Sequence, residues 1–290
     1  MHGVLVIDKP KGITSFDVVR DVRRALKLKK VGHTGTLDPM ATGVLPICVG
    51  DGTKIAQFIL EATKAYDATL KLGATTDTLD ADGKVLVTRP VPALTPQVLE
   101  QALAKFRGTF QQVPPMYSAI KVGGKRLYEL ARAGEEIERR PREVTVYELT
   151  LRDFSADEVK FSVRSSKGFF VRSLAADLGE ALGCGAHLTA LRRTQSGPFT
   201  LAQALPLADL VANPAIAAER VVGSSDALKD LPVVTLSAAE AERARHGGVV
   251  EVAASLTGTH RVLEPSGALL AIADAVKGRL AWRRVLTRDE

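Results

Sequence analysis

The amino-acid sequence predicts an α+β fold with a large N-terminal domain, residues 1–231, and a small β-rich domain, residues 232–290. The length of 290 residues fits two domains, at about 150 residues per domain. Strand and helix patterns mix along the chain without the regular βαβ alternation of a doubly wound parallel sheet. After the weakly periodic segment Pro206–Pro232, short strand patterns dominate.

The first elements are a short strand and an amphipathic helix. Val4–Ile7 is a continuous apolar run that ends before Pro10. Thr14 and Asp17 have the spacing of a capping box, in which each side chain satisfies a backbone N–H of the other. Apolar side chains then recur at helical spacing, at Phe16, Val19, Val22, Ala25 and Leu26. We therefore expect a helix there, with a basic outer face.

A glycine-rich loop and two strands follow. Residues 31–43 are rich in Gly, Thr, Asp and Pro, and we expect no regular structure in them. Val44–Val49 predicts a buried strand, and Asp51 is placed to cap a helix that ends near Glu61. Residues 66–72 alternate between apolar and polar side chains, which is typical of a half-buried strand.

Later patterns complete both domains. The large domain is predicted to add a helix, two strands and a helix, at residues 95–106, 144–154, 159–164 and 171–182. Ser237 and Glu240 form a capping box for one short helix of the small domain. Its strands are expected at residues 249–252, 261–263, 269–273 and 280–286. One helix with several short strands suggests a small barrel-like module.

Composition restricts the partner and the compartment. Lys and Arg number 39 and Asp and Glu 33, so the net charge of +6 suits a phosphate-rich partner such as nucleic acid. Cys48 and Cys184 are too few and too distant for a disulfide framework. The start has no signal-peptide pattern, and no apolar run approaches about 18 residues. We expect a cytoplasmic protein that contacts no membrane and is a monomer.

Most familiar chemical motifs are missing from the sequence. No GxGxxG follows a strand, Gly123-Gly124-Lys125 lacks the flanking residues of a P-loop, and neither HxxxH nor CxxC occurs. The run 80–83 resembles part of a calcium loop, but Thr78 and Arg89 occupy ligand positions unsuited to calcium. We therefore expect neither a metal nor an organic cofactor.

The loop Gly32–Gly43 is the strongest candidate for a chemical site. It surrounds one carboxylate, Asp38, with His33, three threonines and glycines, between a basic helix and an apolar strand. A structural Asp-Pro turn is the alternative, since that pair often starts a turn. Loops held by rigid elements are nevertheless where catalytic groups concentrate.

Several ordered blocks over the first 200 residues resemble one family. They are GVLVIDKP at residues 3–10, VGHTGTLDPMATGVLPICVG at 31–50, Tyr66 with Leu72-Gly73, PPMYSA at 114–119, and the stretch from Ser166 to Arg193. The sequence is thereby similar to bacterial TruB-type tRNA pseudouridine synthases. The resemblance implies a pseudouridine-synthase fold, a mixed and mostly antiparallel sheet flanked by helices and loops. The last residues resemble the PUA RNA-binding module.

The resemblance also implies site residues. It makes Asp38 the nucleophile, Arg172 its ionic partner, and Tyr66 the ring that stacks on the target base. Substrate-binding positions are His33, Leu191, Asp80, Lys9 and Phe170, with Lys9 bracing the loop of Asp38. Several have a structural alternative: a solvated charge for Arg172, core packing for Tyr66 and Leu191, a loop hydrogen bond for His33, and a turn for Asp80. The family commonly has Thr-Tyr at Phe169-Phe170, so a tyrosine hydroxyl is missing there.

The implied activity isomerises the uridine at position 55 in the TΨC loop of tRNA. Uracil is detached from C1′ of its ribose, turned and rejoined through C5, after the base has flipped out of its stack. A carboxylate can assist by covalent addition at C6 of the base or at C1′ of the sugar, and the sequence leaves both open. The basic helix, residues 121–126 and Arg192-Arg193 are candidates for phosphate contacts. A non-catalytic tRNA-binding chaperone is the alternative function.

Overall fold

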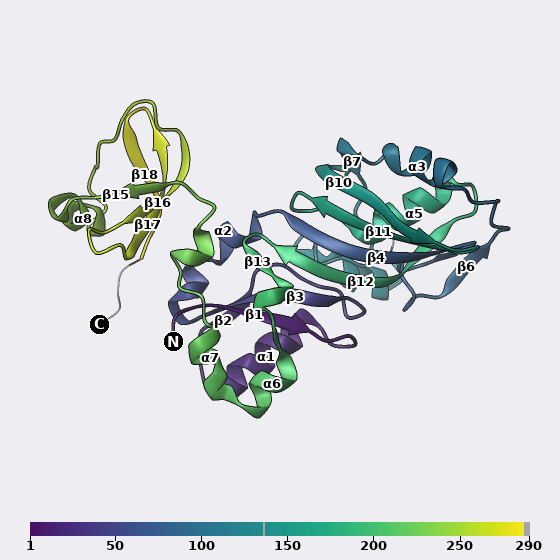
Figure 1. Ribbon diagram of the computed structural model, residues 1–290, viewed down its shortest axis with the longest axis horizontal. Coiled ribbons are helices and arrows are strands. Elements are labelled where there is room, and N and C mark those ends of the chain that lie inside the picture. Colours follow the sequence, from purple (N-terminus) through teal and green to yellow (C-terminus); the bar gives the residue numbers. More distant parts are fainter. Residues whose placement is uncertain (136, 287–290) are drawn as a thin grey trace.

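The computed structural model describes residues 1–135 and 137–286, which contain one large mixed sheet and a separate small sheet near the C-terminal end. In Figure 1 the small sheet and its helix lie at the upper left, apart from the large sheet. The large sheet twists across the rest of the molecule, with helices on its flanks (Figure 1).

Eight strands form the continuous path of the large sheet, in the order β14-β1-β3-β12-β4-β11-β10-β7, and β2 and β13 add to β3 and β12. Neighbours are antiparallel except for the pairs β1–β14 and β3–β12. The predicted α+β class with a mostly antiparallel sheet is confirmed. The strands are β1 (Gly3–Lys9), β2 (Val31–His33), β3 (Thr42–Val49), β4 (Lys64–Leu72), β7 (Gly108–Gln112), β10 (Arg142–Phe154), β11 (Glu158–Ser165), β12 (Ala186–Ser196), β13 (Phe199–Thr200) and β14 (Leu205–Pro206).

The first helix, α1 (Ser15–Leu26), begins where its capping box predicts. The Thr14 hydroxyl accepts the N–H of Asp17 at 3.1 Å, and the Asp17 carboxylate accepts the N–H of Thr14 at 2.9 Å. These bonds satisfy two backbone donors that a helix start leaves without partners. Val18 and Val22 are fully buried, so the helix packs its apolar stripe inward.

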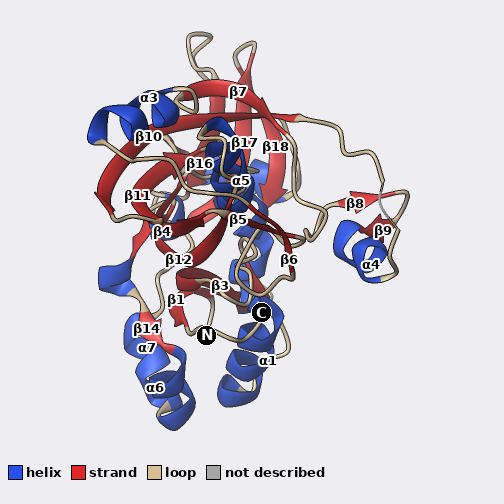
Figure 2. Cartoon of the chain, turned by 90° about the vertical axis from the view of Figure 1, so that its right-hand side faces the viewer, coloured by secondary structure: helices blue, strands red, loops and turns tan. Residues whose placement is uncertain are grey.

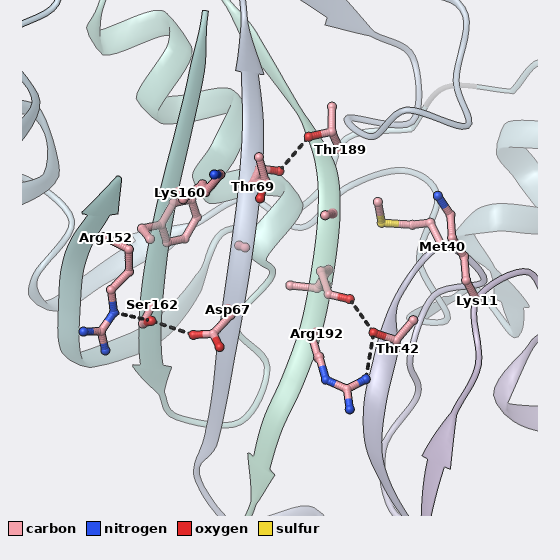
Figure 3. A pocket seen from close by; sticks show the side chains of 14 residues that line it. Lys11, Met40, Thr42, Asp67, Thr69, Arg152, Lys160, Ser162, Thr189 and Arg192 are labelled. Atoms are coloured by element: carbon pink, nitrogen blue, oxygen red, sulfur yellow. Dashed lines mark hydrogen bonds between the residues drawn. The ribbon is translucent and has the colours of Figure 1, made fainter. Parts of the chain in front are cut away.

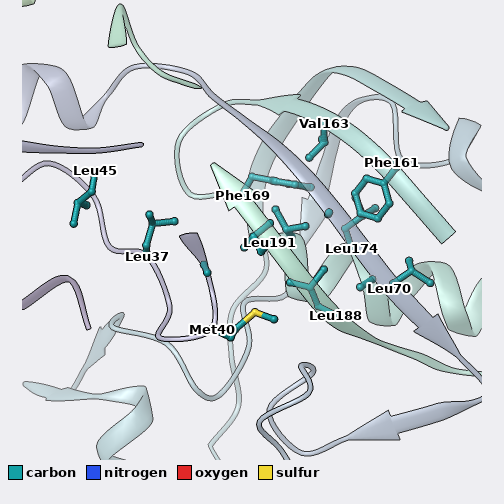
Figure 4. Packing of buried hydrophobic residues seen from close by; sticks show 14 of the residues in the cluster. Leu37, Met40, Leu45, Leu70, Phe161, Val163, Phe169, Leu174, Leu188 and Leu191 are labelled. Atoms are coloured by element: carbon teal, nitrogen blue, oxygen red, sulfur yellow. The ribbon is translucent and has the colours of Figure 1, made fainter. Parts of the chain in front are cut away.

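Two helices cover one face of the central strands and close the main core. α5 (Val171–Ala181) packs on β12 and β4, and α3 (Pro96–Ala104) packs on α5 and β10. Figure 4 shows buried side chains of this core, which include Leu70, Phe161 and Leu174. These three residues are at most 1% exposed. Burial of such a side chain contributes about 2 kcal/mol to the free energy of unfolding.

Two hairpins stand outside the large sheet. β5 (Ala74–Thr76) pairs with β6 (Val85–Thr88), and β8 (Lys121–Val122) pairs with β9 (Lys125–Arg126). Figure 2 shows the β8–β9 hairpin and α4 (Leu127–Arg132) projecting from the side of the molecule on extended connections.

Short helices complete the chain between β3 and β4 and between β12 and the small sheet. They are the 3-10 helix η1 (Gly50–Ile55) and α2 (Ala56–Leu60) in the first segment, and η2 (Leu201–Gln203), α6 (Leu207–Ala212), η3 (Pro214–Ile216), α7 (Ala217–Arg220) and η4 (Asp226–Leu228) in the second. α6 packs on α1, which places the second segment beside the N-terminal helix.

The small sheet has the order β15-β16-β17-β18 and carries one helix. Its elements are β15 (Val233–Thr235), α8 (Ala238–Arg245), β16 (Gly258–Leu263), β17 (Leu269–Val276) and β18 (Arg279–Val285). The predicted capping box is present, since Ser237 and Glu240 bond to each other's backbone N–H groups. Ile272 of β17 is fully buried in the same hydrophobic cluster as Val4, Ile59 and Leu228, so this cluster joins the small sheet to the rest of the molecule.

Three predictions of local structure are wrong. Val31–His33 is not irregular, because it pairs with the edge of β3 as β2 despite its glycine. Asp51 does not cap a helix; η1 begins after Val49 with no side-chain cap, and Asp51 pairs with Lys54 at 3.1 Å. Residues 249–252 form only an isolated bridge, between Glu251 and Arg279, because their hydrogen bonds reach no further along the free edge of β18 than Gly278 and Leu280.

A search of residues 1–135 and 137–286 finds no helix with the length and apolar character needed to cross a membrane.

Gly43 lies where β3 passes closest to β12, and its side-chain position is occupied. Its φ is +99°, and a Cβ would stand 2.2 Å from the carbonyl oxygen of Arg193. Gly12 has a similar φ of +92°, but a Cβ there would meet no atom within 4 Å. We expect Gly43→Ala to lower the free energy of unfolding by about 3 kcal/mol or more, because a clash adds to the backbone strain.

Gly12→Ala is the matched control and should cost only about 1–2 kcal/mol, from strain alone. Urea unfolding of both variants measures the difference. Equal losses would contradict the close approach of the two strands.

Candidate active site

The site is centred on an ion pair between Asp38 and Arg172. The Arg172 Nε lies 2.8 Å from one carboxylate oxygen of Asp38, and its Nη2 donates to the other at 3.1 Å. The Arg172 side chain is 4% exposed and that of Asp38 is 31% exposed. The carboxylate is therefore held from its buried side and open on the other. The sequence placed these residues together through the family resemblance alone.

Backbone carbonyls and a second carboxylate hold the Arg172 guanidinium in place. Its Nη1 donates to the carbonyl of Thr78 at 2.9 Å, and its Nη2 donates to that of Tyr117 at 2.7 Å. The Asp80 carboxylate lies 3.6 Å from Nη1. Asp80 is 5% exposed, and burial raises its pKa although the Thr78 hydroxyl donates to it at 2.6 Å. Asp80 thus helps to hold the guanidinium that contacts Asp38.

Gln112 fixes the backbone immediately before α5. This side chain is 3% exposed, and its oxygen accepts the N–H of Phe170 at 2.9 Å while its amide nitrogen donates to the Phe170 carbonyl at 3.1 Å. These two hydrogen bonds fix the point at which α5 begins, and Arg172 is the second residue of that helix. Sequence analysis missed Gln112, since a lone glutamine at the end of a strand has no local signal.

Lys9 and Ser15 brace the loop of Asp38 from below. The Lys9 ammonium donates to the carbonyls of Pro10, Pro39 and Ala41 at 2.9, 3.3 and 2.7 Å, and the residue is fully buried. The Ser15 hydroxyl accepts the N–H of Leu37 at 2.8 Å and donates to its carbonyl at 3.1 Å. Lys9 is therefore a positioning residue, because burial leaves no surface through which a substrate could reach it.

Arg193 is a second buried guanidinium beneath the same loop. It is 1% exposed and donates to the carbonyls of Val44, Gly35 and Thr36 at 2.6, 3.3 and 3.5 Å. Burial lowers the pKa of Arg193, and its cross-strand partner Tyr66 partly offsets that effect.

The prediction that Arg192-Arg193 contacts phosphate is wrong for Arg193, because its guanidinium is enclosed. β12 was not predicted, so nothing in the sequence showed that this residue points inward. Arg192 is 42% exposed and pairs with Asp8 at 2.7 Å.

A cavity of about 310 Å³ opens beside the ion pair. Of the predicted site residues, Asp38, Tyr66, Phe170, Arg172 and Leu191 line it. Asp80 and Lys9 lie behind the wall, and His33 lies at the end of β2 outside the lining. The His33 Nδ1 accepts the N–H of Gly35 at 3.3 Å, and burial lowers the pKa of its imidazole, so the ring is neutral near pH 7.

A second cavity, of about 590 Å³, lies on the opposite face of the sheet (Figure 3). Asp67 lines this cavity and its neighbour on β4, Tyr66, lines the smaller one, because successive side chains of a strand leave opposite faces; Leu191 lies in both linings. Its one lining carboxylate, Asp67, accepts a hydrogen bond from Ser162 at 2.6 Å and has no arginine held against it as Asp38 has. The smaller cavity is therefore the candidate active site.

The described residues include no group of three His, Cys, Asp or Glu side chains that could hold a metal ion. What the small cavity offers is a carboxylate held by a buried guanidinium, an aromatic ring and apolar walls. This arrangement suits an enzyme that uses covalent catalysis on a flat, uncharged ring.

Family comparison agrees with this class. Residues 23–171 match the model described as TruB family pseudouridylate synthase (N terminal domain), and residues 172–232 match that of the tRNA pseudouridylate synthase B C-terminal domain. The tRNA pseudouridine synthase B of Dechloromonas aromatica (strain RCB) is 47% identical over 289 residues, which cover 99% of this chain and 96% of the relative. That of Azoarcus sp. (strain BH72) is 46% identical and covers 99% and 95%.

Solved structures show the same likeness. A chain in the crystal structure of a Cbf5-Nop10-Gar1 complex superposes with a TM-score of 0.79 at 27% identity, over 99% of this chain and 85% of the other. The chain belongs to the TruB family of pseudouridylate synthases. It is an isomerase that makes pseudouridine, and its substrate is tRNA.

The buried ammonium of Lys9 gives the stability a defined pH dependence. Burial lowers its pKa from 10.5 to about 8 in the folded protein, against the opposing effect of Asp38. Between these values the unfolded chain binds more protons than the folded one, so stability rises with pH. As the pH rises from 8 to 10.5, the free energy of unfolding of wild type should increase by on the order of 3 kcal/mol relative to that of Lys9→Met.

Urea unfolding of both proteins from pH 7.5 to pH 10.5 tests this expectation. A stability difference that does not change with pH would contradict a charged lysine at this buried position.

Proposed function

We propose that the enzyme isomerises the uridine at position 55 in the TΨC loop of tRNA, with Asp38 as nucleophile. The observation that supports this most is the two-point contact of a buried guanidinium with a carboxylate at the wall of a cavity. The cavity, about 310 Å³, is of the size used for small-molecule sites. A uracil base, once flipped out of its stack, fits such a space.

The reaction breaks the bond between N1 of uracil and C1′, and forms a bond between C5 and C1′. The proton of C5 is lost and N1 gains one, so the reaction is balanced without a redox partner. Asp38 adds covalently at C6 or at C1′ and leaves again, dividing one difficult step into easier ones. Arg172 keeps its carboxylate oriented, since its two-point contact fixes the plane of that group.

The other lining residues bind the base. The ring of Tyr66 lies in the cavity wall and its hydroxyl end interacts with Arg193, which suits stacking and proton handling at C5. Leu191 and Phe170 supply apolar contact. Asp80 lies behind the cavity wall and holds Arg172, so the family role at the flipped nucleotide is exerted through that guanidinium. His33, which lies at the end of β2 outside the cavity lining, stacks within the opened T-loop as a neutral ring.

The remaining assignments concern the whole chain. Residues 1–231 form the catalytic domain and residues 232–290 a PUA-like module that adds affinity for the T-arm. The small sheet with its capped helix supports the second assignment. We place the enzyme in the cytoplasm as a monomer that uses no metal or cofactor; two buried, unpaired cysteines suit a reducing compartment.

A non-catalytic tRNA chaperone is the second candidate. Binding alone would not require a buried arginine to be held by the turn of Thr78 and Asp80 and by the backbone of Tyr117 against one partly open carboxylate. The combination of Asp38, Arg172 and Tyr66 in one cavity therefore favours the enzyme.

Asp38→Asn separates the two functions. The amide keeps the shape of the side chain but is a poor nucleophile, so pseudouridine formation should fall by about 10⁴-fold or more while T-arm binding is retained. Release of tritium from 5-labelled uridine in a T-arm transcript measures turnover, and filter binding measures affinity.

Asp67→Asn is the control, because Asp67 is on the same sheet but opens to the other face. It should behave as wild type. Turnover by Asp38→Asn near the wild-type rate would remove Asp38 from the proposed role.

Tyr66→Phe tests the tyrosine hydroxyl. The variant keeps the ring but removes the partner of Arg193 and the proton-handling group, so kcat should fall by about 10²-fold or more with little change in KM. Tyr147→Phe, on the exposed side of β10, is the control. Single-turnover rates measure the effect, and a Tyr66→Phe rate equal to that of wild type would leave the tyrosine a stacking role only.

A further inference from the structure

Lys64 is a cation of the cavity wall to which neither the chemistry nor the base contacts give a role. It is the first residue of β4, two positions before Tyr66 and on the same face of the sheet. Its side chain is 7% exposed and lines the cavity with Tyr66 and Asp38. A lysine this deeply buried is rare unless it has an ionic partner.

Backbone carbonyls accept hydrogen bonds from only two of the three N–H donors of the Lys64 ammonium. It donates to the carbonyls of Leu60 and Ala62, each at 2.6 Å, at the end of α2. An ammonium has three donors, so one remains. The pKa of Lys64 is lowered from 10.5 to about 8, chiefly by burial; the charges of Arg193 and Lys167 add to this effect and that of Glu61 opposes it.

The cavity wall as a whole has an excess of positive charge. Its lining includes four cationic side chains, Lys64, Lys167, Arg172 and Arg193, but a single carboxylate, Asp38. Arg172 uses Asp38, and Lys167 pairs with Glu61 outside the lining. Lys64 and Arg193 are left with carbonyl groups and a tyrosine as their hydrogen-bonding partners among the described residues.

Capping of the C-terminal end of α2 explains the two hydrogen bonds from Lys64 to carbonyls, but it does not explain why the ammonium is buried in the cavity wall. Lysines commonly bond the last carbonyls of a helix, yet they do so from the surface, where the ammonium stays hydrated. Here the ammonium is buried beside other cations, which costs free energy in the empty enzyme. An arriving anion would remove that cost at Lys64 and reduce the excess of positive charge in the wall.

We propose that Lys64 binds the backbone phosphate next to the flipped uridine. The proposal rests on the proposed function, since it concerns the nucleotide that enters this cavity. The base and the ribose are uncharged, so a flanking phosphate is the one anion that the nucleotide brings. The contact would hold the ribose while the base is detached and turned.

The test pairs a protein variant with a neutral phosphate. T-arm stem-loops are made with a methylphosphonate on the 5′ or the 3′ side of the target uridine, which removes one charge at a time. We expect Lys64→Met to weaken binding of the unmodified stem-loop by about tenfold or more, as for loss of a charge-assisted hydrogen bond. One of the two neutral linkages should weaken wild type similarly.

The decisive result is non-additivity. On the stem-loop with the critical neutral linkage, Lys64→Met and wild type should bind equally, because the contact is already absent. Lys71→Met, on the same strand but on the other face, is the matched control and should change affinity less than twofold. Lys64→Arg should recover part of the loss.

The proposal would be overturned if Lys64→Met lowered the affinity by the same factor on the unmodified stem-loop and on both stem-loops with a neutral linkage. Should Lys64→Met fail to fold, wild type alone decides, because no effect of either neutral linkage would also overturn it. Failure of the proposed function is distinct from both, since wild type would then form no pseudouridine on the unmodified stem-loop.

Discussion

The burial of the Arg172 charge is the constraint on which the site depends. A guanidinium that is 4% exposed must find oxygen acceptors in every direction, because an unpaired buried charge costs several kcal/mol. Its acceptors come from segments far apart in the chain: the loop of Asp38, the turn at Thr78 and Asp80, and the backbone at Tyr117. The hydrogen bonds and ion pairs of Arg172 therefore also hold these three segments together above the sheet.

The same principle operates beneath the loop of Asp38. Lys9 and Arg193 place their charges among loop carbonyls, where an uncharged side chain would leave several oxygens without donors. The loop has few bonds within itself, so its shape is imposed by cations on neighbouring strands. A carboxylate on such a loop keeps its orientation without losing its open side.

Short-range patterns in the sequence correctly predict the helices and strands that are stabilised by interactions between residues close in the chain. The capping box of Thr14 and Asp17 and the alternation along β4 give helix and strand correctly, because cap bonds and strand faces involve near neighbours. Asp38 and Arg172 could be paired only through the family resemblance. Gln112, Lys64 and the inward direction of Arg193 could not be predicted, since each depends on where β12 or β7 lies in the finished sheet.

The position of Arg193 in the chain has a consequence for the order in which the enzyme is built. The loop of Asp38 is synthesised early, but a cation that shapes it appears about 150 residues later, on β12. At roughly 5–20 residues per second, ribosomes need on the order of ten seconds or more to make that stretch. The nascent chain thus passes through a long period in which the loop lacks its support, and it becomes competent for catalysis only when nearly two thirds of the protein exists.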